Sequence, residues 1–102
     1  MISVGSFDID SIAAATKKVQ VFEIHFAAMK MLAEYYIDLR DVQSAIKTYE
    51  FLKRYTEDNK RYKEKLKLYE QLGYCHRLLR EHSMACFFFK KQLELSWEQN
   101  NL

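Results

Sequence analysis

Residues 69–89 read YEQLGYCHRLLREHSMACFFF, and this segment contains two runs of apolar side chains separated by a polar stretch. In the first run, Tyr69 and Leu72 are spaced so that they share one face of a helix. In the second run, Ala85 and Phe89 share a face in the same way. The segment therefore predicts a helical hairpin, two antiparallel helices joined by a short polar turn.

The same pattern occurs 40 residues earlier in the chain. The matching pairs are Leu32 with Leu72, Ala33 with Gly73, Leu39 with Leu79, Arg40 with Arg80, Asp41 with Glu81, Ala45 with Ala85 and Tyr49 with Phe89. The repeat predicts two hairpins, with helices over about 19–38, 42–57, 60–79 and 82–99. Asp41 is expected to cap the second helix, because its carboxylate can accept N–H groups of the first turn.

Small residues mark the points at which paired helices should cross. Gly73 is expected to lie against the helix that carries Ala85, and Ala33 against the helix that carries Ala45. A bulky side chain at any of these positions would force the two helices apart. The pattern therefore predicts the pairing of helices 19–38 with 42–57 and of helices 60–79 with 82–99.

The composition agrees with a helical chain. The 102 residues fit one small domain, and they include no proline and only two glycines. The hydrophobic fraction of 49% and the aromatic fraction of 15% are high for a domain whose core is small. We therefore expect that some apolar side chains are buried against another molecule. The formal net charge of +2 gives little support to a nucleic-acid role.

These motifs resemble the tetratricopeptide repeat (TPR). That repeat places a large residue, Leu-Gly and an aromatic residue on its first helix, and Ala followed four positions later by Phe on its second. Tyr69, Leu72, Gly73 and His76 with Ala85 and Phe89 follow the pattern, as do Met29, Leu32, Ala33 and Tyr36 with Ala45 and Tyr49. The resemblance implies an all-α fold of antiparallel helical hairpins stacked as a short α-solenoid.

The sequence also departs from the family pattern. Its period is 40 residues, whereas the usual TPR period is about 34. The longer period is similar to a variant found in cell-polarity adaptors and in some ciliary and cytoskeletal proteins. The closing proline of the motif is absent, with Trp97 near its place, and Gln92 occupies a position that is usually small. The resemblance divides the chain into repeats at 19–58 and 59–102.

Residues 1–18 allow two interpretations. They can form a lead-in helix that continues into the first repeat, which Ala13, Ala14 and Ala15 favour. They can also be part of a preceding repeat, with Gly5 and Ile9 in the Ala and Phe positions. We favour the lead-in helix.

The resemblance implies a protein-binding adaptor or scaffold that is not an enzyme. First helices of TPR hairpins line a groove that accepts a partner segment. The corresponding residues are Lys30, Glu34, Ile37, Lys67, Glu70, Tyr74 and Arg77. Some family members hold a peptide carboxylate with Lys and, four residues later, Asn. The pairs here are Lys30 with Glu34 and Glu70 with Tyr74, so we expect no binding of acidic C-terminal peptides such as those of the major chaperones.

A second interaction surface is expected on the last helix. Repeat arrays bury their core by stacking, and about three repeats are needed for stability. Only two are present, and Met84, Phe88 and Leu95 form an apolar seam on the last helix. Phe87 falls among polar residues, and Trp97 extends the apolar arc. These five residues predict a docking edge for a partner or a second copy. The alternative is a structural subunit of a large assembly, such as a cytoskeletal or ciliary one.

Other chemistries are poorly supported. No catalytic, nucleotide-binding or metalloprotease motif is present, and no cofactor is expected. A zinc site formed by Cys75, His76, His82 and Cys86 is disfavoured, because adjacent residues diverge on a helix. RNA binding would depend on the basic run of Lys60, Arg61, Lys63, Lys65 and Lys67, which is more typical of a solvated helix face. With no signal peptide and no apolar membrane span, a cytoplasmic location is expected.

Overall fold

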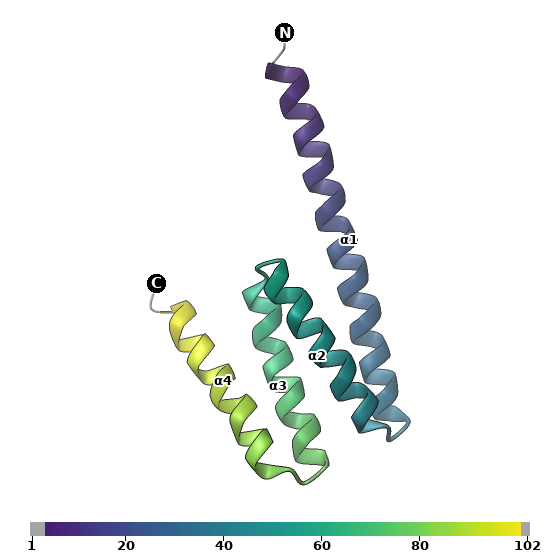
Figure 1. Ribbon diagram of the computed structural model, residues 1–102, viewed down its shortest axis with the longest axis vertical. Coiled ribbons are helices and arrows are strands. Elements are labelled where there is room, and N and C mark those ends of the chain that lie inside the picture. The colour runs from purple at the N-terminus through teal and green to yellow at the C-terminus, as the bar shows by residue number, and fades with distance from the viewer. Residues whose placement is uncertain (1–3, 101–102) are drawn as a thin grey trace.

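The computed structural model describes the backbone of residues 4–100, with side chains at Ala14 and from Lys17 to Asn100. It contains four helices, α1 (Val4–Asp38), α2 (Val42–Asp58), α3 (Tyr62–Leu78) and α4 (His82–Asn100). Residues 4–100 contain no β-strand, so the predicted all-α class is confirmed (Figure 1). The predicted boundaries of the last three helices are correct to within about two residues, which is the usual uncertainty of helix ends.

The first helix is much longer than its repeat requires. α1 runs without interruption from Val4 to Asp38, whereas the repeat pattern predicts a helix that begins near residue 19. Residues 4–18 therefore continue directly into the first hairpin, as a lead-in helix would. Figure 1 shows this N-terminal half of α1 projecting beyond the ends of the other helices.

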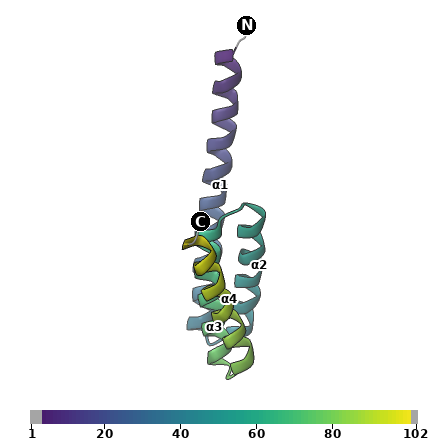
Figure 2. The ribbon, with the colours of Figure 1, turned by 90° about the vertical axis from the view of Figure 1, so that its left-hand side faces the viewer.

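The four helices form one open layer. α1 packs on α2, α2 on α3 and α3 on α4, and within the described residues no other pair of helices comes close enough for backbone contact. The molecule measures 62 × 35 × 14 Å along its principal axes, and Figure 2 shows how thin the layer is. Because each helix contacts only its neighbours in sequence, α1 and α4 each keep a side that no other helix covers.

The three turns between helices have the same backbone structure. Each contains one residue in the left-handed region, Arg40 (φ 67°), Lys60 (φ 56°) or Arg80 (φ 60°). The following N–H donates to a carbonyl of the preceding helix, as from Asp41 to Tyr36 at 2.8 Å, which closes a Schellman-type C-cap. The turns recur every 20 residues, and two such steps make the 40-residue repeat.

The predicted cap of α2 is confirmed. The N–H of Ser44 donates to Oδ1 of Asp41 at 3.2 Å, which satisfies one donor of the first helical turn. Hydrogen bonds from the side chain and the backbone of Ser44 lower the pKa of the exposed Asp41 carboxyl below its usual value. The equivalent position at α3 is Arg61, whose side chain makes no capping hydrogen bond.

The core follows the seams between successive helices. Its buried members are Ala33, Ala45, Tyr49, Leu52, Leu68, Leu72, Cys75 and Phe88. Ala33 and Ala45 are both fully buried, as expected where α1 crosses α2. A Cβ atom placed on Gly73 would lie 2.6 Å from Cε1 of Phe89, so glycine is needed for the close approach of α3 and α4. The predicted contact of Gly73 with the helix that carries Ala85 is confirmed.

Candidate protein-interaction surfaces

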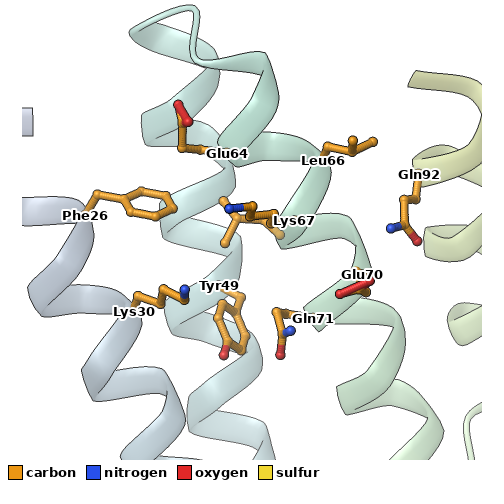
Figure 3. Close-up of a pocket in the computed structure, with 10 residues that line it drawn as sticks. Phe26, Lys30, Tyr49, Glu64, Leu66, Lys67, Glu70, Gln71 and Gln92 are labelled. Atoms are coloured by element: carbon orange, nitrogen blue, oxygen red, sulfur yellow. The ribbon is translucent and has the colours of Figure 1, made fainter. Parts of the chain in front are cut away.

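A groove of about 400 Å³ lies between α1 and α3, with α2 behind it (Figure 3). Its lining residues are Phe26, Lys30, Tyr49, Glu64, Leu66, Lys67, Leu68, Glu70, Gln71 and Gln92. These residues define what we call the α1–α3 groove. It exists because α1 and α3 both pack against α2 but not against each other. The layer is therefore hollowed between alternate helices, where a partner segment can lie.

The rim of the α1–α3 groove combines both charges. Lys30 from α1 and Lys67 from α3 contribute ammonium groups, and Glu64 and Glu70 from α3 contribute carboxylates. Glu64 also lies 3.8 Å from the guanidinium of Arg61. With two cations and two anions, the rim favours a ligand of low net charge, either uncharged or with charges of both signs. A strongly acidic or strongly basic ligand would be repelled by half of these groups.

The inner wall of the groove is apolar. Tyr49 and Leu68 are buried, and Tyr49 lies between Lys30 and Gln71 in Figure 3. The Tyr49 hydroxyl has no hydrogen-bond partner among the described residues, and burial raises the pKa of this phenol to about 12. Tyr49 is therefore neutral at physiological pH and forms the floor beneath the groove. The accessible apolar surface comes from the partly exposed Phe26 and Leu66.

The structure brings together part of the predicted groove. Lys30, Lys67 and Glu70 all line it, whereas the other four predicted positions do not. These four are Glu34, Ile37, Tyr74 and Arg77. The apolar residues Phe26 and Leu66 also line the groove but were not predicted to do so, although the two are 40 residues apart and thus occupy equivalent repeat positions. This equivalence could have predicted both residues as part of the groove, because both lie on the first helix of a hairpin.

The predicted docking edge on α4 needs correction. Phe88 is only 4% exposed and Leu95 only 9%, so the expectation that these two side chains are exposed is wrong. The Phe88 ring stacks on His76 at 5.4 Å and lies 6.3 Å from the Tyr69 ring, both on α3. Phe88 is buried because the face of α4 that packs on α3 includes Phe88 as well as Ala85.

Other apolar side chains of α4 are exposed. Leu93 and Trp97 are each 71% exposed, and Met84 and Phe87 of the predicted edge are also exposed. Leu93 lines a second cavity of about 350 Å³ with Leu66, Phe89, Gln92 and Ser96. The exposed apolar surface of α4 is therefore centred on Leu93 and Trp97 and includes neither Phe88 nor Leu95.

A comparable apolar surface lies on α1, on the side away from α2. Its exposed members are Val21, Ile24, Ala28, Met31, Leu32 and Tyr35. They recur at steps of three, four or seven residues and so share one helix face. The sequence analysis assigned no role to this face.

The candidate metal ligands do not converge. Nδ1 of His76 lies 2.8 Å from Oε1 of Glu81, and the His76 ring also packs on Phe88. Cys75 is buried, which raises the pKa of its thiol to about 11, whereas Cys86 is exposed. Within the described part of the chain, no three side chains of His, Cys, Asp or Glu are placed to hold a metal ion.

The basic run is partly neutralised by acidic side chains. Nζ of Lys65 lies 2.8 Å from Glu57, and the guanidinium of Arg61 lies 3.1 Å from Glu23. Arg61 also stacks over the Phe22 ring at 4.3 Å, which ties the start of α3 to α1. These two cations therefore have structural roles, which leaves less positive charge for phosphate binding.

Among the described residues, no helix is both long and apolar enough to cross a membrane. No family model, curated protein or solved structure matches this chain.

Proposed function

We propose that this chain is a protein-interaction module that binds a partner segment in the α1–α3 groove. The groove is the observation that supports the proposal, since it combines an apolar wall with a mixed-charge rim. Its volume of about 400 Å³ falls within the usual range of ligand sites, about 300–1,000 Å³. The likeness of both hairpins to tetratricopeptide repeats supports the same function and a scaffold or adaptor role. On that likeness we propose a cytoplasmic location, with a cytoskeletal structure as the alternative.

The ligand we favour is an extended or helical protein segment with an apolar anchor. The anchor would pack on Phe26 and Leu66, the partly exposed apolar residues of the lining. Its flanking charges would meet the lysines and glutamates that alternate around the rim. Most of the affinity would come from the desolvated anchor, because charges at a rim contribute mainly to orientation and association rate.

The test is a selection of random peptides against the chain, followed by measurement of their affinity for groove variants. The variant Lys30→Glu/Lys67→Glu leaves the buried wall intact and reverses both cations. We expect about a tenfold loss of affinity, equivalent to about 1.4 kcal/mol, because the two reversed charges would repel the acidic flank of a bound segment that they attract in the wild type. Lys17→Glu/Lys63→Glu is the matched control, because it makes the same charge change at exposed lysines outside the groove.

Equal affinity of both variants for the selected peptides would refute the groove as the binding site. The same assay tests ligand type. A peptide ending in an acidic C-terminal motif is expected not to bind. By the TPR resemblance, Glu70 occupies a position at which carboxylate-binding members carry a lysine. Micromolar binding of such a peptide, lost in Lys30→Ala, would contradict this expectation.

The second candidate function is that of a structural subunit in a larger assembly. The exposed apolar faces of α1 and α4 favour it, because contiguous exposed apolar patches mark interaction surfaces. A subunit would use these end faces continuously, whereas an adaptor would use mainly the groove. RNA binding is the weakest candidate, given the ion pairs of Lys65 and Arg61.

A further inference from the structure

The packing of α2 on α3 joins the two hairpins and shows how one hairpin covers the next. On α3, Leu68, Leu72 and Cys75 are buried in one cluster with residues of α2 that include Leu52. On α2, Tyr49 is fully buried beside Cys75, and Glu57 pairs with Lys65 across the two helices at 2.8 Å. A second helix of one repeat is therefore covered by the first helix of the next.

The α3 side of this interface has an equivalent on α1, which the 40-residue repeat identifies. Leu68, Leu72 and Cys75 correspond to Ala28, Leu32 and Tyr35. The positions are buried on α3 but exposed on α1, where Tyr35 is 58% exposed. Met31, at 69% exposed, extends the same face. The exposed apolar face of α1 is thus the equivalent of the α3 surface that α2 covers.

The α2 side of the same interface has its equivalent on α4. The α2 residues Tyr49, Lys53, Thr56 and Glu57 correspond to Phe89, Leu93, Ser96 and Trp97. Phe89, Leu93 and Ser96 line the open cavity of about 350 Å³, whereas Tyr49 and Thr56 are fully buried in the first hairpin. The cavity therefore lies where a following first helix would pack.

We propose that copies of this chain associate head to tail, with α4 of one copy packed on α1 of the next. The new interface would repeat the one that α2 and α3 make within each copy. At the position of the Glu57–Lys65 ion pair, it would bring together Trp97 and His25. Loss of these charges makes the surfaces more apolar and suits them to each other, as at the core of a protein interface.

The long α1 is compatible with this arrangement. Asn100 near the end of α4 corresponds to Lys60 in the turn between α2 and α3. A neighbouring α4 would therefore reach only as far as about residue 20 of α1. The N-terminal half of α1 continues past that level as a projecting helix (Figure 1). The two helices can pack side by side without a break in either one.

The proposed interface is heterologous, because it joins two different faces. Such a contact does not close on itself after two copies, so association continues with rising concentration. A symmetric dimer, made by two α1 faces or by two α4 faces, would instead stop at two copies. The difference makes complementation between variants the decisive experiment.

The experiment is sedimentation equilibrium of the full chain over roughly 10 µM to 1 mM. The wild type is expected to rise progressively above its monomer mass of 12.3 kDa and to exceed the dimer mass. Met31→Glu/Tyr35→Glu removes the α1 face, and Leu93→Glu removes the α4 face. Each variant changes only exposed side chains, and each alone is expected to remain monomeric. Lys63→Glu, exposed and outside both faces, should associate like the wild type.

An equimolar mixture of the two face variants is expected to form a 1:1 dimer and nothing larger, since each supplies the face that the other lacks. Circular dichroism of each variant establishes that the helices are retained. The proposal is overturned if the wild type stays monomeric throughout, which would assign the two faces to other proteins. It is also overturned if either variant alone still dimerises, or if the mixture shows no dimer.

Discussion

Gly73 on α3 has a role that its helix propensity alone would not suggest. Glycine in a helix costs about 1 kcal/mol relative to alanine, yet a Cβ at this position would meet the Phe89 ring at 2.6–2.8 Å. We expect Gly73→Ala to destabilise the chain by about 1–2 kcal/mol, because overpacking outweighs the gain in propensity. Urea denaturation followed by circular dichroism measures the change.

The control for this prediction is the Phe89→Ala background, in which the obstructing ring is removed. There, Gly73→Ala should become neutral or stabilise by up to about 1 kcal/mol, the intrinsic helix preference. If Gly73→Ala stabilises equally with and without the Phe89 ring, the close approach of α3 and α4 at this position is contradicted.

At the scale of elements, the three turns each hold a non-glycine residue with positive φ. An L-residue in this conformation is strained by roughly 1–2 kcal/mol, and glycine relieves that strain while adding freedom to the unfolded chain. We therefore expect Arg40→Gly and Arg80→Gly each to stabilise the chain by about 0.5–1 kcal/mol. The measurement is the urea midpoint of each variant.

Alanine at the same two positions is the matched comparison, since it removes the arginine side chain but retains the strain. Arg40→Ala and Arg80→Ala should leave the midpoint nearly unchanged. If alanine stabilises as much as glycine, the effect comes from the lost charge, and the left-handed turn conformation is not its cause.

The helices themselves could be predicted because their signals are local. Apolar spacing and the 40-residue repeat gave four helices and their pairing, and Asp41 marked the start of α2. The rotation of α4 could not be predicted, because it depends on how Phe88 fits against His76 and Tyr69 of α3. The exposure of Phe88 and Leu95 was therefore misjudged.

The candidate site was partly predictable for a related reason. Lys30, Lys67 and Glu70 follow from their repeat positions on first helices. The contributions of Tyr49 and Gln92 come from second helices, and they depend on α1 and α3 standing apart on the same side of α2. The distance between α1 and α3 cannot be predicted from the residue pattern of any single helix.

At the scale of the whole molecule, one structural property underlies both interaction surfaces. Each helix packs only on its neighbours in sequence, so the layer has a groove between alternate helices and an uncovered face at each end. A globular bundle of the same helices would bury both features. The open layer therefore supports the groove as the site for a different protein and the end faces as sites for further copies.

Binding of a partner segment in the α1–α3 groove would change the surroundings of the residues that line it. Titration of a selected peptide into the isotope-labelled chain, followed by the backbone amide signals in NMR spectra, tests it most directly. The largest shifts are expected at Lys30, Lys67 and Gln71, which line the groove from α1 and α3. Largest shifts at the end faces, around Met31 on α1 or Leu93 on α4, with the groove signals unmoved, would contradict it.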